Sequence, residues 1–329
     1  MIKSVRFQNF KALRDTTLPL EPFTLIIGPN GSGKSSALQA IEGVQARDLD
    51  GASVVTASFG QAEDAQASVE IRWTGRWKRL ITTVRWLQNG ARGVEHRPNS
   101  WDPEVNQVLG GVRVYTLDAS AIAATSKLQP SDTLQRDGSH LAGVLDRLRD
   151  QHPERFEALN DELARCVPEF DRVVFDTPRV GERAFLLRMR EEQHPIPASE
   201  LSQGTLLALA ILTLAYLPDP PKIIGLEEPD RGIHPRLLRN VRDALYRLSH
   251  PESCAEKRDP VQVIATTHSP YFLDLFKDHP EEIVIANKEE GGARFERLSD
   301  RKDLDEMLAD AHLGDVWYTG ILGGVPLER

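Results

Sequence analysis

The stretch 28-GPNGSGKSS-36 sets the interpretation of the whole chain. Residues 23–27 before it form a short apolar run, typical of a strand buried on both faces, and residues 35–44 after it have a helical pattern. Glycines let backbone amides converge on phosphate oxygens, and a helix start adds a positive dipole. The stretch therefore predicts a nucleoside triphosphate site, with Lys34 on the β- and γ-phosphates and the Ser35 hydroxyl on Mg²⁺.

Two further apolar strands are predicted to end in polar residues. Residues 223–226 directly precede Glu227 and Glu228. Residues 261–265 are followed by two threonines and then His268. Ligands bind at the carboxyl ends of such strands in open α/β sheets. We expect Glu227 to hold Mg²⁺ through its water shell and Glu228 to orient or deprotonate the attacking water. A lone histidine after a strand is more often structural, but together with the other two motifs His268 is predicted to sense the γ-phosphate. Lys34, Glu228 and His268 are the expected catalytic residues.

A second predicted helix start has the features of an anion site. Ser202 is placed to cap the apolar segment 202–217, and Gly204 allows close backbone approach. By itself this is simply a capped helix, and one nucleotide cannot readily use two helix starts.

Four motifs occur in a fixed order: the phosphate stretch, then LSQGT at 201–205, EEPDRGIHP at 227–235 and TTHSPYFLDLF at 266–276. This set resembles the ABC-type ATPase superfamily, in the soluble branch with RecF, SMC heads and the overcoming-lysogenization-defect ATPases. It is similar to the short stand-alone AAA_21-type ATPases. The resemblance implies an α/β P-loop NTPase of ABC-ATPase head type, whose mixed sheet is joined by an antiparallel β subdomain and a helical lobe.

The resemblance also implies a homodimer that closes head to tail around ATP and Mg²⁺. Asp230 and Arg231 would then lie in a loop that crosses the interface, although the family more often has glutamate at the position of Asp230. The family's lid glutamine is not identifiable, because the predicted strand 112–117 ends at Asp118. The implied ATP contacts are Asn30, Gly31, Gly33, Lys34, Ser35 and Ser36 of one subunit with Ser202 and Gly204 of the other.

The rest of the chain divides into regions of different character. Strands are predicted at 52–59, 67–73, 79–87, 112–117, 170–175 and 183–189, and helical segments at 138–148, 153–167 and 235–249. We expect one domain, 1–329, with a nucleotide-binding lobe at 1–118 plus 222–329 and a helical, signature lobe at 119–221. The loop 251–260 is predicted to be an exposed, charged connection.

Composition excludes several classes of protein. Among 329 residues, 40 Lys and Arg against 49 Asp and Glu give a net charge of −9, unlike a basic nucleic-acid-packaging protein. The two cysteines, Cys166 and Cys254, are too far apart to suggest a disulfide framework or a zinc site. No apolar run reaches the roughly 18 residues of a membrane span, so we expect a cytoplasmic protein without a membrane partner.

One stretch, residues 72–101, is locally basic. It holds seven arginines and lysines against Glu95 alone, with four interleaved tryptophans. The composition suits contact with DNA phosphates, through Arg72, Arg76, Lys78, Arg79 and Arg85. An antiparallel sheet with arginines on its wet face and tryptophans on its packed face explains the same pattern, and both interpretations stay open.

The resemblance narrows the function to an ATP-driven switch. The 168-residue spacing from Lys34 to Ser202 has no heptads, which argues against chromosome tethering, and the 61 residues after His268 are too few for the nuclease domain of the lysogenization-defect family. We therefore expect an ATPase that controls a separate effector, a nuclease or toxin, in bacterial antiphage defence. The alternative is a RecF-like ATPase acting on DNA in repair or recombination.

Overall fold

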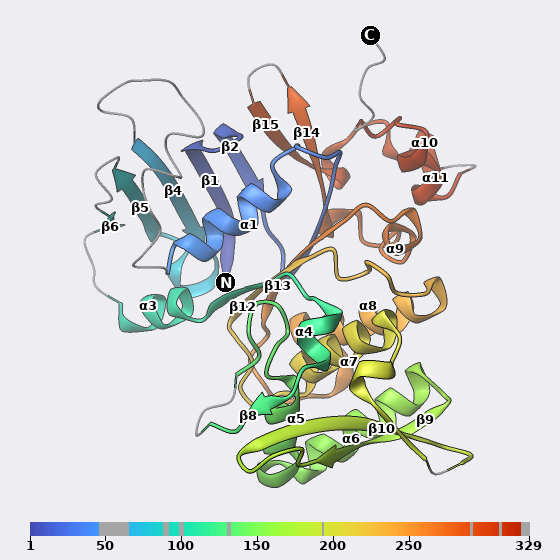
Figure 1. The fold of residues 1–329 in the computed structure, drawn as a ribbon. Helices are drawn as coiled ribbons and strands as arrows, with labels where there is room; N and C mark the ends of the chain where they lie inside the picture. Colours follow the sequence, from blue (N-terminus) through green and yellow to red (C-terminus); the bar gives the residue numbers. More distant parts are fainter. Residues whose placement is uncertain are drawn as a thin grey trace. The chain divides into compact units, whose positions relative to one another are not determined.

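The computed structural model describes residues 1–45, 66–87, 92–98, 102–129, 133–192, 194–289, 292–308 and 311–323. The chain forms two compact units (Figure 1). The first consists of Met1–Val114, Pro221–Leu226 and Pro260–Arg329, and the second of Tyr115–Pro220 and Glu227–Asp259. Residues 227–259 thus group with the second unit, whereas the sequence analysis placed them in the nucleotide-binding lobe.

A six-stranded mixed sheet is the centre of the first unit. Its strand β3 runs parallel to β13 on one side and to β14 on the other, while β15 closes the edge antiparallel to β14. All five residues of β3 and all six of β13 are buried. The apolar residues of the two strands predict this for strands covered on both faces, and in β13 the polar Gln262, Thr266 and Thr267 are buried as well. The order is β15 (Gly292–Arg297), β14 (Ile283–Glu289), β3 (Phe23–Ile27), β13 (Gln262–Thr267), β12 (Ile223–Glu227) and β7 (Val112–Tyr115).

A five-stranded antiparallel sheet is the other layer of this unit. Buried and exposed residues alternate along its strands, so one face packs and the other meets solvent. The helix α1 (Lys34–Gly43) contacts β1 of this sheet and β13 of the mixed sheet, and one hydrophobic cluster joins the three. The order is β2 (Leu13–Pro19), β1 (Ile2–Phe10), β4 (Gln66–Trp73), β5 (Ile81–Leu87) and β6 (Arg92–Arg97). The predicted strand 52–59 lies outside the described residues.

Short helices complete the first unit. The ring of Phe23 in β3 stacks on that of Phe276 with centroids 4.8 Å apart, which anchors the chain after β13. Gly314 at the start of α11 donates its N–H to the Asp274 carboxylate at 2.7 Å, which fixes α11 on α9. These helices are η1 (Gly75–Trp77), α3 (Pro103–Gly110), α9 (Pro270–Asp274), η4 (Pro280–Glu282), η5 (Leu298–Asp300), α10 (Leu304–Leu308) and α11 (Leu313–Tyr318).

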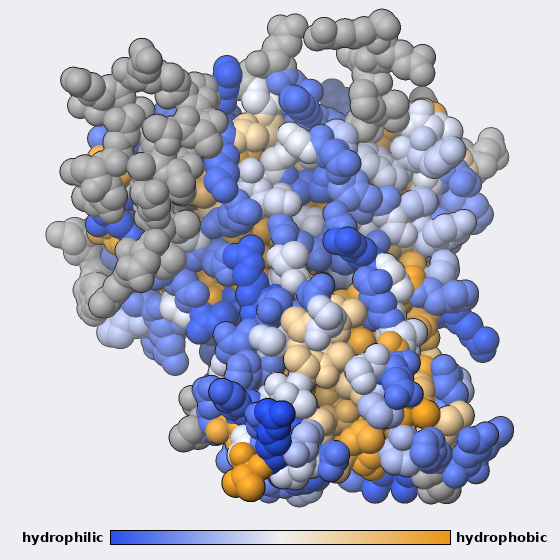
Figure 2. All heavy atoms as spheres, in the orientation of Figure 1, coloured by the Kyte–Doolittle hydropathy of each residue, from blue (hydrophilic) through white to orange (hydrophobic). Residues whose placement is uncertain are grey.

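The second unit is mainly helical, with a small antiparallel sheet. The helices predicted at 138–148, 153–167, 202–217 and 235–249 are confirmed as α5 (Leu141–Gln151), α6 (Pro153–Cys166), α7 (Gln203–Tyr216) and α8 (Pro235–Ser249). In the view of Figure 2, hydrophobic residues gather over the region of α4 and β10. The remaining elements are α4 (Ala119–Ala123), β8 (Ser126–Lys127), β9 (Phe170–Asp176), β10 (Glu182–Met189), β11 (Pro195–Pro197), η2 (Ala198–Glu200) and η3 (Pro251–Cys254).

Within the described residues, no helix combines the length and the apolar character needed to cross a bilayer.

Candidate functional site

The phosphate loop needs glycine at specific positions. Gly31 and Gly33 have φ of 76° and 94°, the left-handed region that side chains disfavour. A Cβ on Gly33 would lie 2.8 Å from Leu13 Cδ2, and one on Gly28 would lie 2.3 Å from the Ala286 carbonyl oxygen. The glycines therefore let the backbone of the turn between β3 and α1 follow a path that other residues could not adopt, which leaves its amides available to an anion.

Lys34 opens α1 and is 7% exposed. Its ammonium donates hydrogen bonds to the carbonyls of Gly28 at 2.7 Å and Pro29 at 2.9 Å, so the side chain lies over its own loop. The neighbouring Ser35 is exposed in the first turn of the helix. An ammonium and a helix start at one loop give the positive field that phosphate needs.

His268 lies at the same sheet edge as the phosphate loop. Strands β3 and β13 pair in parallel up to Ile27 opposite Thr267, and the next residues along the two strands are Gly28 and His268. Ser269 then caps α9 by accepting the Phe272 N–H at 3.2 Å, which ends the strand sharply. The structure thus brings Lys34, Ser35 and His268 together within the first unit.

Glu227 is the last residue of β12 and Glu228 follows the strand, and both belong to the second unit. Glu227 Oε2 accepts a hydrogen bond from the Thr116 hydroxyl at 2.8 Å. Glu227 Oε1 is buried and has no hydrogen-bond partner among the described residues. Glu228 follows with a φ of 46°, which is costly for a residue other than glycine and is typical of functional sites.

Thr116 is a candidate residue that none of the four sequence motifs indicates. The available signal was its place: β7, the strand predicted at 112–117, ends at Tyr115, and a polar side chain follows at once. Asp118, at which the predicted strand 112–117 ends, caps α4. Its carboxylate accepts hydrogen bonds from the Ala121 N–H at 2.9 Å and from the Ser120 hydroxyl. Those hydrogen bonds, with a smaller contribution from the charge of Arg231, hold the pKa of Asp118 below its usual value.

The signature helix α7 begins as predicted, with Ser202 as its cap. The Ser202 hydroxyl accepts the Thr205 N–H at 3.2 Å and lies 2.8 Å from the Thr205 hydroxyl. A Cβ on Gly204 would lie 2.9 Å from the Gly232 carbonyl oxygen and 3.3 Å from Ile233 Cα. The start of α7 therefore packs directly on the loop that follows Glu228, all within the second unit.

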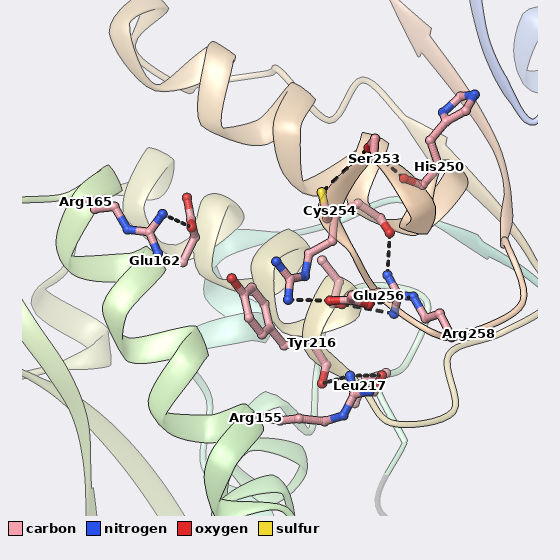
Figure 3. A network of polar contacts seen from close by, with 12 residues as sticks. Arg155, Glu162, Arg165, Tyr216, Leu217, His250, Ser253, Cys254, Glu256 and Arg258 are labelled. Atoms are coloured by element: carbon pink, nitrogen blue, oxygen red, sulfur yellow. Dashed lines mark hydrogen bonds and ion pairs between the residues drawn. The ribbon is translucent and has the colours of Figure 1, made fainter.

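The other end of α7 is held by a charged network (Figure 3). Arg258 donates to the carbonyls of Ala215 at 3.2 Å and Arg247 at 2.6 Å, and it pairs with Glu256 at 3.0 Å. Arg247 also pairs with Glu256 and lies 4.3 Å from the centre of the Tyr216 ring.

Most of the loop 251–260 is exposed, as the sequence predicts, but this network buries part of it. The side chains of Arg258 and Glu256 are only 9% and 14% exposed, because the loop folds back onto α7 and α8. Burial lowers the pKa of Arg258, partly offset by the Glu256 charge. Cys254, in the same segment, stays exposed and lies 3.7 Å from the Ser253 hydroxyl.

The tryptophans of the basic stretch pack as the structural interpretation predicts. Trp73 and Trp86 are buried at 1% and 0% exposure, against the hydrophobic cluster of the first unit. Trp77 is partly buried and donates to Asp102 at 2.6 Å. Tryptophans presented for base stacking would be exposed, so these three serve the core.

The arginines of that stretch lie on the wet face, largely neutralised. Arg72 pairs with Glu70, Arg76 with Glu104, and Arg85 with Glu95. Glu70 also lines a groove of about 880 Å³ formed by β1, β2, β4 and residues of β14 and β15. The charged residues of that groove are Asp15, Glu70 and Glu289 with Lys3, Arg6, Arg72 and Arg294. Three of the five basic residues predicted to contact DNA are thus paired with acids. Among the described residues, no acid pairs with the other two, Lys78 and Arg79.

Comparison with known proteins places these features in a family. The family model described as "AAA domain, putative AbiEii toxin, Type IV TA system" matches residues 23–274. The chain is similar to the OLD nuclease of Thermus scotoductus, at 24% identity over 95% of this chain and 68% of the relative. It is also similar to the Old nuclease of Escherichia phage P2, at 21% identity over 83% of this chain and 57% of that protein. The fold matches an SMC head solved with the C-winged helix domain of ScpA, with a TM-score of 0.65 at 16% identity over 91% of this chain and 99% of that one.

Proposed function

Because the chain belongs to the AAA_21 family, and is an ABC-type ATPase of the SMC, RecF and OLD class, we propose that it is an ATP-dependent molecular switch in the cytoplasm. In this proposal it binds and hydrolyses ATP with Mg²⁺ and controls a separate effector protein. The observation that carries the proposal is the glycine-built turn that holds Lys34 beside the strand end of His268.

The residues divide the work by their chemistry. Amides of the phosphate loop, with Asn30, Gly31, Gly33 and Ser36, cradle the phosphates, and Lys34 leaves its loop carbonyls for phosphate oxygens. Glu228 orients the attacking water and accepts its proton, and His268 contacts the γ-phosphate.

The donor set fits Mg²⁺. The buried Oε1 of Glu227, which accepts no hydrogen bond from the described residues, is a hard oxygen suited to a Mg²⁺ ion or its water shell. The exposed hydroxyl of Ser35 at the start of α1 is the second expected ligand. Bound Mg²⁺ would neutralise charge on the phosphates during transfer.

A head-to-tail homodimer explains why one chain carries two anion-binding helix starts. Ser202 and Gly204 of one subunit would cover the ATP held by Lys34 of the other. Closure around ATP then couples nucleotide binding to subunit contact, as a switch requires. Asp230 and Arg231, in the loop against which Gly204 packs, are placed by the same proposal at the interface.

The effector is inferred to be a nuclease or toxin of bacterial antiphage defence. Two features support this role: the toxin system in the family's description, and the nuclease relatives of greater length. The alternative is a RecF-like ATPase that acts on DNA, which Lys78 and Arg79 favour because they have no acidic partner in the part of the chain that the structure describes. Turnover stimulated by DNA and lost in a Lys78→Glu, Arg79→Glu variant would support the alternative.

Nucleotide turnover and light scattering test the switch together. We expect Lys34→Ala to abolish ATP hydrolysis, and Glu228→Gln to keep ATP binding and accumulate a dimer, because only the hydrolytic step is blocked. Ser202→Arg should bind ATP as a monomer, and mixing it with Lys34→Ala should restore part of the activity, since one composite site stays intact.

Lys127→Ala, which removes an exposed lysine of β8, is the matched control and should behave as the parent. Parent-level hydrolysis by both Lys34→Ala and Glu228→Gln would overturn the site, and full activity from a Ser202→Arg monomer would overturn the dimer.

A further inference from the structure

Among the described residues, the hydroxyl of Thr116 is the one hydrogen-bond partner of the Glu227 carboxylate, and this contact joins residues 111 positions apart in the sequence. Thr116 is exposed and stands directly after β7, while Glu227 is the last residue of β12. Such a contact is not needed to close a hydrophobic core, so its effect falls on the carboxylate.

The backbone around Thr116 is held by the loop 136–138. Its N–H donates to the Arg136 carbonyl at 2.9 Å, and two residues later the Asp118 N–H donates to the Asp137 carbonyl at 2.9 Å. A Cβ on Gly138 would lie 3.2 Å from Leu117 Cδ2, so the loop 136–138 packs closely on this segment. These backbone contacts therefore fix the position from which the Thr116 hydroxyl reaches Glu227.

The hydrogen bond gives the two carboxylate oxygens of Glu227 different environments. Oε2 is occupied by the Thr116 hydroxyl at 2.8 Å, and Oε1 is buried without a hydrogen-bond partner among the described residues. A hydrogen bond to a charged carboxylate is stronger than one between neutral groups and fixes its rotation. Partners of this kind orient metal-binding carboxylates and tune their affinity.

We propose that Thr116 is a positioning residue for Glu227, holding Oε2 so that Oε1 faces the Mg²⁺ that accompanies ATP. The inference rests on the proposed ATPase function and assigns a role that the sequence motifs leave open. Asp118 does not take this role, because its carboxylate is engaged in capping α4.

The test compares three variants for Mg²⁺-dependent binding of a fluorescent ATP analogue and for the Mg²⁺ concentration at half-maximal turnover. Thr116→Val keeps the shape and removes the hydroxyl, and should need about tenfold more Mg²⁺ in both assays. Thr116→Ser restores the hydroxyl and should return to within about twofold of the parent. Thr125→Val removes an exposed hydroxyl of the same unit that makes no hydrogen bond among the described residues, and should match the parent.

The outcomes separate this inference from the proposed function. A parent protein that binds the analogue without any Mg²⁺ dependence would refute the metal site itself. A normal parent with Thr116→Val at the parent Mg²⁺ requirement would refute the positioning role alone. Equal losses in Thr116→Val and Thr116→Ser would also refute it, because the hydroxyl would not be the cause. If Thr116→Val unfolds, Thr116→Ala is measured in its place against the same limits.

Discussion

Replacing Gly204 with alanine would add one methyl group where the signature helix meets the loop after Glu228. The new Cβ would lie 2.9 Å from the Gly232 carbonyl oxygen, 3.3 Å from Ile233 Cα and 3.7 Å from the His234 nitrogen. All three neighbours are backbone atoms, so no flexible side chain can turn away. Ordinary contact begins at 3.4 Å, so the Gly232 carbonyl must move about half an ångström away from the new Cβ.

The cost of that retreat follows from packing. Overpacking a well-fitted contact costs about 1–3 kcal/mol. Alanine regains up to about 1 kcal/mol over glycine in a helix interior, and less at the first turn where Gly204 stands. We therefore expect Gly204→Ala to lose about 1–2 kcal/mol of unfolding free energy. Because the loop joins Glu228 to α8, turnover should fall further than ATP affinity.

Denaturant unfolding and steady-state turnover measure the two effects. Gly110→Ala is the matched control, because Gly110 also lies in a helix and a Cβ there would meet nothing within 4 Å. The control should be as stable as the parent or slightly more so, with the same turnover. If Gly204→Ala unfolds and turns over like Gly110→Ala, the contact between the signature helix and this loop does not have the inferred importance.

Two further predictions concern charged side chains. Glu256→Gln should lower the unfolding free energy by about 3 kcal/mol, because it leaves the nearly buried Arg258 without its counter-charge, and denaturant unfolding checks this. Glu95 has its pKa lowered from 4.5 to about 2 by hydrogen bonds from Arg97 and Arg85. A carboxyl group whose pKa is lower in the folded than in the unfolded state stabilises the folded state at pH values above its unfolded pKa. The small difference in unfolding free energy between the parent and Glu95→Gln should therefore be complete above about pH 4.5. It should vanish as the pH falls towards 2, and a difference that grows on acidification would contradict the assignment.

The parts of the fold that sequence predicts well depend on local pattern. The buried strand at 23–27 and the centre of the strand at 262–267, residues 263–265, are apolar runs. The phosphate loop between strand and helix is set by glycines whose φ values or close neighbours exclude side chains. The alternation of the apolar Val84 and Trp86 with the charged Arg85 likewise predicts which face of the antiparallel sheet is buried. These signals act over a few residues and need no knowledge of distant partners.

The parts that sequence does not predict depend on distant partners. Thr116 reaches the Glu227 carboxylate only because β7 and β12 are neighbouring strands: Thr116 follows β7, and Glu227 ends β12. Arg258 reads as a loop charge, yet its partners are backbone carbonyls of α7 and α8. The excess charge of residues 72–101 is offset by Glu70 and Glu104, which lie just outside that window. Counting charges within a window cannot find such neighbours.

The segment that carries Arg258 also supplies a ready attachment point for a spectroscopic probe. The chain has two cysteines: Cys166 is buried, and burial raises the pKa of its thiol to about 12, whereas Cys254 is exposed. Thiol reagents act on the thiolate, so at neutral pH labelling should be confined to Cys254 without any engineered substitution. A fluorophore on Cys254 would lie in the segment that holds the end of α7. Its emission would report whether these contacts change when ATP or ADP is bound.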